Sequence, residues 1–382
     1  MTDANDRPNL VKIAVDCSFF AGPTQGLSRY LRALLPRLIA ISPENVRWLL
    51  YTRHGTSLPC MEEHRRVIVR RDKLPSDSGR LLSLFSSMPA WAYHDKPSVF
   101  WAPAHRAPLW LPRGTRSVLT VHDLAWAEVP QTMRRSTRII DKWFMNRSVQ
   151  RADFLISVSH ATAASLERWL PSSAQRTRVI YPAAEAPPIP GDLALVAPGL
   201  KRGHYILFVG TPEPRKNLPR LLEGYALARQ QNPNVPALVL AGGNGWGQQP
   251  TAIIDQQALR PFVHSLGKVS DQHLSTLYAN ALCLALPSLY EGFGLPLVEA
   301  MAAGLPIITS NSSSMREVAG PAALLVDPLS ATDIANALLR ISEDRLLHAT
   351  LAAVARQQAP RYSWDTAAAA TLEVLLDASA SA

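Results

Sequence analysis

The chain contains few cysteines, and their spacing disfavours the structures that cysteines most often build. Among its 382 residues there are three, Cys17, Cys60 and Cys283, which lie far apart and form no Cys-x-x-Cys pair. This pattern argues against a disulfide framework and a structural zinc site, and it suits a reducing cytoplasm. The sequence also lacks any Asp-x-Asp pair, an arrangement that would hold a divalent cation against a diphosphate. We therefore expect a metal-free site and a cytoplasmic protein.

Long apolar runs are missing as well. No stretch approaches the roughly 20 apolar residues that a membrane-spanning helix needs. The first segment, from Met1 to Pro8, is polar and acidic and contains no hydrophobic signal core. The composition is otherwise that of a folded protein, with 47% hydrophobic and 18% charged residues, and the length suffices for two domains. Neither a membrane-spanning nor a disordered chain is expected.

Acidic residues are too scarce in one half of the chain to balance its cations. Residues 1–185 hold 26 Lys and Arg against 15 Asp and Glu, a net charge of +11, whereas residues 186–382 hold 13 against 15, a net charge of −2. A basic N-terminal half suits an anionic partner, such as a membrane surface, a lipid diphosphate or nucleic acid. The plain alternative is that the excess of cations serves only to keep the protein soluble. No nucleic-acid-binding motif accompanies the charge, so we expect no nucleic-acid partner.

The order of elements predicts an α/β fold with parallel, doubly wound sheets. Apolar runs typical of strands alternate with helical segments in both halves, and prolines and glycines cluster between the two series. These features predict a domain over residues 9–184, a linker over 185–203, a second domain over 204–360 and a last helical segment over 361–382. Strands are expected at 11–15, 47–51, 67–69, 118–121, 153–158, 205–209, 237–240, 282–286 and 307–309.

The stretch from Glu291 to Glu299 combines the parts of an anion-binding site in one strand-to-helix connection. Pro296 suits the first turn of the helix, where its missing N–H would be unpaired anyway. The helix start offers free N–H groups and a partial positive charge to a phosphate, and the two glycines before it let backbone approach a ligand. We hypothesise that Glu291 accepts hydrogen bonds from sugar hydroxyls and Glu299 from a ribose. For Glu299, an acid favoured by the helix dipole is the alternative.

Two adjacent cations, Arg215 and Lys216, follow another predicted strand. Adjacent cations usually belong to a solvated loop. Here they lie past the carboxyl end of a strand, where a diphosphate leaving group would need neutralising. A guanidinium can hold two phosphate oxygens at once, while an ammonium acts as a point charge. The pair therefore predicts a diphosphate site.

The segment Glu291-Gly-Phe-Gly-Leu-Pro-Leu-Val-Glu299 resembles the E-x7-E motif of the retaining glycosyltransferases of family 4, which have the GT-B fold. Other segments follow in that family's order over nearly the whole chain: Gly22-Pro-Thr-Gln-Gly26 with Arg29-Tyr30, His122-Asp123, Gly210 to Asn217, Gly242 to Trp246, and Gly267 to Val269. The resemblance implies two Rossmann-like domains facing across a cleft. The donor would lie on the C-terminal domain and the acceptor on the N-terminal one, to which the last helix would cross back.

The resemblance also implies which residues form the site. His122 would contact the transferred sugar or help to set up the acceptor, and Asp123 would orient the ring or act as a base. A structural histidine is the alternative. The catalytic residues would be His122, Asp123, Arg215, Lys216 and Glu291. The donor would be held by Gly26, Gly210, Arg215, Lys216, Gly243, Val269, Glu291, Gly292, Phe293, Gly294, Leu295 and Glu299.

The implied activity is metal-independent transfer of a sugar from a nucleotide diphosphate to a hydroxyl, with retained anomeric configuration. The motifs look most similar to those of bacterial polysaccharide mannosyl- and rhamnosyltransferases. They favour GDP-mannose as the donor, with UDP-sugars as runner-up, and a lipid-linked oligosaccharide of O-antigen or exopolysaccharide as the acceptor. A nucleotide-sugar epimerase or phosphorylase of the same fold is the first alternative. A non-catalytic binding subunit is the second, although the intact motif residues argue against it.

The segment from Met133 to Arg151 mixes cations with apolar side chains. At about 100° per residue its cations and its apolar residues fall on opposite sides of a helix. The cations are Arg134, Arg135, Arg138 and Lys142, and the apolar residues are Met133, Ile139, Ile140, Trp143 and Phe144. Such a helix could lie on an anionic membrane and make the protein peripheral to it. A helix that packs its apolar face on its own domain is an equal alternative.

Overall fold

The structure, a computed structural model, describes residues 10–21, 26–59, 61–73, 79–184, 189–243, 245–247 and 250–381. The chain forms two compact units, each made of segments that are distant in sequence. The first unit comprises Met1–Leu124, Ile139–Pro182 and Trp364–Ala382, and the second comprises Ala125–Arg138 and Ala183–Ser363.

The first unit contains a parallel sheet of seven strands in the order β3-β2-β1-β4-β5-β6-β7. Its strand β1 lies between β2 and β4 and is buried from Ile13 to Asp16, because helices cover both faces of the sheet. Ile13 lies opposite Trp48 of β2 and Val99 of β4, and all three are fully buried. The strands are β1 (Val11–Asp16), β2 (Val46–Thr52), β3 (Val67–Arg71), β4 (Val99–Ala102), β5 (Arg116–Val121), β6 (Phe154–Ser157) and β7 (Thr177–Val179).

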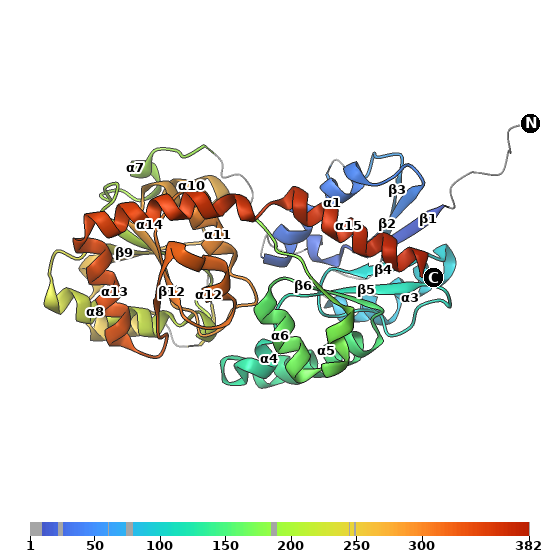
Figure 1. Cartoon of the computed structure of the whole chain (residues 1–382), viewed down its shortest axis with the longest axis horizontal. Helices are drawn as coiled ribbons and strands as arrows, with labels where there is room; N and C mark the ends of the chain where they lie inside the picture. The colour runs from blue at the N-terminus through green and yellow to red at the C-terminus, as the bar shows by residue number, and fades with distance from the viewer. Residues whose placement is uncertain are drawn as a thin grey trace, which may run out of the picture. The chain divides into compact units, whose positions relative to one another are not determined.

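Helices cover both faces of this sheet (Figure 1). They are α1 (Gly26–Ile41), α2 (Gly79–Phe85), α3 (Ser87–Asp95), α5 (Arg135–Arg151), α6 (His160–Trp169) and the last helix α15 (Trp364–Ala380). The helix α15 packs against α1 and contacts β4, β5 and β6, so the end of the chain belongs to the first unit. Arg37 of α1 pairs with Asp365 at 3.1 Å. Figure 1 shows α5 and α6 on the other side of the sheet from α15.

The second unit has a parallel sheet of six strands in the order β10-β9-β8-β11-β12-β13. This is the order of a dinucleotide-binding sheet, and the direction of winding reverses between β8 and β11. Ligands of such sheets bind at that reversal, beyond the carboxyl ends of the strands. The strands are β8 (Tyr205–Val209), β9 (Ala237–Ala241), β10 (Val263–Gly267), β11 (Cys283–Leu286), β12 (Ile307–Ser310) and β13 (Ala323–Val326).

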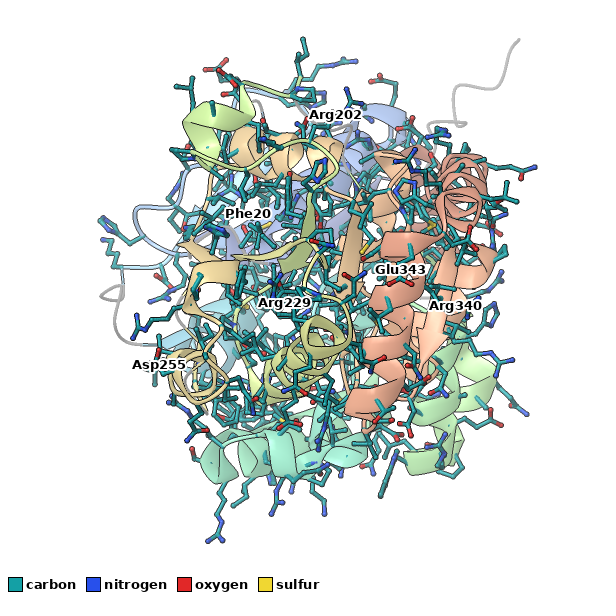
Figure 2. All side chains as sticks on the ribbon, turned by 90° about the vertical axis from the view of Figure 1, so that its left-hand side faces the viewer. Phe20, Arg202, Arg229, Asp255, Arg340 and Glu343 are labelled. Carbon is teal, nitrogen blue, oxygen red and sulfur yellow. The ribbon has the colours of Figure 1, made fainter. Side chains whose placement is uncertain are left out.

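The helices of the second unit are α4 (Ala125–Glu128), α7 (Leu193–Val196), α8 (Leu218–Gln231), α9 (Pro250–Gln256), α10 (Asp271–Asn280), α11 (Leu295–Ala302), α12 (Ser313–Ala319), α13 (Ala331–Glu343) and α14 (Arg345–Gln358). Figure 2 shows this unit from the side of α8, α9 and α13, with Arg229, Asp255, Arg340 and Glu343 labelled. The helices α8 and α13 pack closely, because Gly224 has no side chain to hold them apart. A Cβ there would lie 2.8 Å from Ile334 Cγ2.

The nine strands expected from the sequence are present, within a residue or two of their expected ends. Four strands, β4, β7, β10 and β13, were not expected. Three of them, β7, β10 and β13, are edge strands that are only partly buried, so burial does not require a continuous apolar run there. Residues 185–203, expected as a linker, include the short helix α7. Part of the range 9–184 groups with the second unit, because Ala125 and Val129 pack against Tyr290. None of the described helices is long and apolar enough to cross a bilayer.

Candidate functional site

The loops after β8 and β11 meet where the second sheet reverses its winding, and a charged cluster joins them. Arg215 Nη1 lies 2.5 Å from Glu291 Oε2, and Lys216 Nζ lies 2.5 Å from Glu291 Oε1. Each carboxylate oxygen therefore holds one of the two cations. Arg215 also donates from Nε to Glu213 Oε2 at 3.0 Å. The sequence predicted all of these positions except Glu213.

The side chains of the cluster carry no net charge, because its two cations are matched by two carboxylates. Glu291 and Lys216 are buried, whereas Arg215 is partly exposed. Burial by itself would raise the pKa of Glu291, but the charges of Arg215 and Lys216 outweigh it and lower the pKa to about 2. Glu291 thus stays ionised throughout the physiological pH range. An incoming diphosphate would compete with this carboxylate for the same cations.

Hydrogen bonds from several elements fix the two loops. Ser288 donates to Glu291 Oε1 at 3.1 Å, and Ser314 of α12 donates to the Glu291 carbonyl at 2.8 Å. The Leu289 N–H donates to the Arg215 carbonyl at 2.8 Å. Asn217 joins the loop after β8 to the loop after β11 and to the loop after β13, because its amide donates to the carbonyls of Pro287 and Pro328. The charged groups are therefore preorganised by the fold.

The start of α11 lies four residues after Glu291. Gly294 precedes the helix with φ +94°, a conformation that disfavours other residues, and a Cβ there would lie 3.1 Å from Met315 Sδ. No side chain caps this end; Pro296 has no N–H, and the Leu297 N–H donates to the Gly294 carbonyl at 2.9 Å. One turn later, Tyr278 of α10 donates to Glu299 Oε2 at 2.8 Å and orients that carboxylate. The helix start and Glu299 suit a phosphate and a ribose, respectively.

The glycine-rich loop after β9 packs on the loop after β8. A Cβ on Gly242 would lie 2.0 Å from the Gly210 carbonyl oxygen, so close backbone packing requires glycine there. Gly243, which the sequence predicted to contact the sugar donor, is less confined. A Cβ there would lie 3.9 Å from Lys268 Cβ. The ring of Trp246 in the same loop lies under the guanidinium of Arg134, 5.5 Å from its centroid. Tight backbone packing is thus sufficient to explain why residue 242 is a glycine.

The remaining residues predicted to bind the sugar donor lie in several parts of the chain. Phe293 is buried, and its ring packs edge-on against Tyr362 at 5.6 Å. Gly292 and Leu295 flank it in the same connection, and Val269 follows β10 and is partly buried. Gly26 is the exposed first residue of α1 in the first unit. The rest of the first glycine loop, residues 22–25, lies outside the described residues, as does Cys60.

His122 and Asp123 follow β5 in the first unit, as predicted. His122 Nε2 lies 2.8 Å from the Pro103 carbonyl oxygen, and Tyr30 of α1 packs edge-on against the ring at 4.8 Å. Because a carbonyl only accepts, Nε2 carries the proton and Nδ1 of the neutral ring is an acceptor. Burial lowers the pKa of His122 to about 4, despite the bond to Pro103. The ring is therefore neutral at physiological pH.

Sequence patterns missed the residues that support the predicted ones. Glu213 stands two positions before Arg215 and could have been found as a neighbouring countercharge. Ser314 and Tyr278 are distant in sequence from the groups they hold, so no local signal marked them. Among the residues that the structure describes, no group of three or more His, Cys, Asp or Glu could hold a metal ion. Metal independence itself remains a prediction.

Solved structures share this two-sheet architecture. Sucrose-phosphate synthase from Thermosynechococcus elongatus superposes with a TM-score of 0.78 at 23% identity, covering 97% of this chain and 100% of that one. WaaG, a glycosyltransferase involved in lipopolysaccharide biosynthesis, gives a TM-score of 0.73 at 18% identity, covering 95% and 99%. At these identities the likeness concerns the fold, which is GT-B as expected.

The sequence comparisons identify the family. The model of the glycosyl transferases group 1 matches residues 198–358, and that of glycosyltransferase family 4 matches residues 24–186. O-antigen chain mannosyltransferase B of Escherichia coli is 30% identical over 372 residues, covering 92% of this chain and 95% of the relative. The chain belongs to glycosyltransferase family 4, a retaining family whose members use nucleotide-sugar donors. The enzyme class expected from the sequence is thereby confirmed.

Proposed function

We propose that this glycosyltransferase moves mannose from GDP-mannose to a hydroxyl of a lipid-linked oligosaccharide in surface polysaccharide synthesis, without a metal. The observation that carries this proposal is the joining of Arg215, Lys216 and Glu291 at the winding reversal of the second sheet. The mannose and the acceptor class are supported by the mannosyltransferase that is similar over nearly the full length. UDP-sugars are the runner-up donors.

The charged cluster suggests how the donor is received. The diphosphate would take Arg215 and Lys216 from Glu291, while the N–H groups at the start of α11 contact its oxygens. Glu291 would then be free to accept hydrogen bonds from the sugar hydroxyls, as the sequence suggested. As the bond from the anomeric carbon to the diphosphate breaks, the two cations stabilise the negative charge on the leaving group. Tyr278 would hold Glu299 toward the ribose.

His122 serves this reaction as a neutral group. With a pKa of about 4 it is a weak base at neutral pH, but its Nδ1 can accept a hydrogen bond from a hydroxyl. We assign it to positioning a hydroxyl of the sugar or acceptor. The Asp123 carboxylate, next in the chain, would help to orient that group.

The product should retain the anomeric configuration of the donor. The charged groups of the second unit act on the leaving diphosphate, which favours a dissociative path with attack from the same face. Inversion would need a base on the opposite face, and His122 is the residue that could supply it. Proton NMR of the first-formed product tests this, because an α-linked donor should give an α-linked product. A β-linked mannoside would show that a base acts behind the anomeric carbon.

A donor and acceptor screen tests the proposed function as a whole. The purified enzyme is incubated with GDP-mannose, UDP-glucose or dTDP-rhamnose, with and without a lipid-linked oligosaccharide. We expect an elongated acceptor with GDP-mannose and little or none with the other donors. Transfer only from a UDP-sugar would support the runner-up donor. An isomerised or free sugar formed without acceptor, or turnover that requires inorganic phosphate, would instead indicate an epimerase or a phosphorylase.

A further inference from the structure

The helix α5 buries a different face from the one expected from its sequence. Its buried residues are Asp141, Phe144, Met145, Ser148 and Val149. Of the apolar residues expected on one face, only Phe144 is buried in this helix, whereas Ile139, Ile140 and Trp143 are exposed. The alternative in which the apolar face packs on its own domain therefore holds for Phe144 but not for the other three. Three large apolar side chains are left in solvent.

Other exposed apolar side chains of the first unit adjoin these three. The ring of Phe144 contacts Trp143 at 4.7 Å and Phe85 of α2 at 5.5 Å, and Phe85 contacts Trp110 at 6.2 Å. Leu82 stands one turn before Phe85 on α2. We call the exposed set the aromatic surface: Leu82, Phe85, Trp110, Ile139, Ile140 and Trp143, each between 37% and 63% exposed. A connected apolar patch of this kind marks an interaction site.

Cations border the aromatic surface. At about 100° per residue, Lys142 lies on one side of the exposed apolar arc of α5 and Arg151 on the other. Arg147 lies within the arc, with its guanidinium 4.5 Å from the centroid of the Trp143 ring. The one carboxylate of α5, Asp141, is buried and paired with Arg106, so it does not offset these charges. The surface thus combines exposed tryptophans and aliphatic side chains with charge of a single sign.

We propose that the aromatic surface docks the first unit on an anionic lipid bilayer. Tryptophan side chains favour the interface between headgroups and acyl chains, aliphatic side chains enter the acyl boundary, and lysine and arginine pair with anionic headgroups. Lysine, which borders this patch, is depleted at protein–protein interfaces. The inference rests on the proposed function in one respect, since a lipid-linked acceptor would be met at this bilayer.

Vesicle co-sedimentation with matched variants tests the surface. The full chain is mixed with vesicles of phosphatidylcholine alone or with added phosphatidylglycerol, without donor or acceptor. The wild type should bind the anionic vesicles, and the double variant Ile139→Ser with Trp143→Ser should bind about tenfold or more weakly. The control, Trp169→Ser with Leu346→Ser, also removes one exposed tryptophan and one exposed aliphatic side chain and should bind like the wild type. Lys142→Glu with Arg147→Glu should abolish the preference for anionic vesicles.

Two outcomes would refute the proposal that the aromatic surface docks on a bilayer. One is equal binding by the surface variant and the control. The other is absence of vesicle binding together with dimers, seen by analytical ultracentrifugation, that only the surface variant disperses. Circular dichroism checks that each variant is folded. Failure of the proposed function is a separate result, because vesicle binding is measured without catalysis. If the wild type bound vesicles but transferred no mannose, the proposed function would be refuted and the docking proposal would stand.

Discussion

Arg215→Ala and Lys216→Ala should each lower the turnover number of sugar transfer by about 10² or more, the usual scale for removing a preorganised group at developing negative charge. Arg215 and Lys216 follow β8 and reach across the winding reversal to Glu291, where a diphosphate leaving group would lie. Losing either cation leaves the charge on the departing diphosphate less stabilised. Steady-state rates with saturating donor and acceptor measure the effect.

Controls separate this role from folding and from metal chemistry. Arg260→Ala removes an exposed arginine that pairs with Asp255 elsewhere in the second unit, and it should leave turnover within about twofold. Thermal unfolding shows whether each variant is folded. The assay is repeated with EDTA and with Mg²⁺ or Mn²⁺. If EDTA abolished activity and a divalent cation restored it, the leaving group would rely on a metal, and the assignment to Arg215 and Lys216 alone would be wrong.

Glu291→Gln should bind the free nucleoside diphosphate more tightly than the wild type while losing sugar transfer. Both carboxylate oxygens of Glu291 hold cations at 2.5 Å, so a diphosphate would compete with this carboxylate for them. The neutral amide of the glutamine would compete less for the two cations. We therefore expect the dissociation constant of GDP to fall about tenfold, a gain of ~1.4 kcal/mol in binding free energy. Transfer should fall by about 10² or more, because the sugar loses a charged hydrogen-bond acceptor. Calorimetric titration with GDP and with GDP-mannose measures the two effects.

A second carboxylate provides the matched comparison. Glu213 Oε2 lies 3.0 Å from Arg215 Nε, and Glu213 is more exposed than Glu291. Glu213→Gln should therefore tighten GDP binding less than Glu291→Gln. If Glu291→Gln weakened GDP and GDP-mannose equally, Glu291 would serve only to position the cations, and no exchange of partners would occur. Unfolding temperatures with and without GDP show whether the unpaired cations destabilise the free variant.

Local sequence patterns were sufficient to predict much of the fold. Buried strands such as Tyr205–Val209 are continuous apolar runs, because helices cover both faces of a parallel sheet. Ser159 caps α6 through a hydrogen bond from the Thr162 N–H, a local contact that its position before a helical segment favours. The edge strand Thr177–Val179 contains no such run, because it is only partly buried and includes Arg178. The α5 helix shows the same limit, because its buried face depends on neighbours such as Phe85 and Arg106.

The sequence by itself determined the family, the two parallel α/β sheets and the positions of the candidate site residues, because glycines, prolines and charges at strand ends have local structural reasons. Only the tertiary structure decided how the site residues are paired. Arg215 and Glu291 are 76 positions apart, and they meet because β8 and β11 are neighbours in the sheet. The structure likewise decided which apolar side chains of α5 remain exposed. Both outcomes depend on contacts between distant segments, which no local pattern of residues encodes.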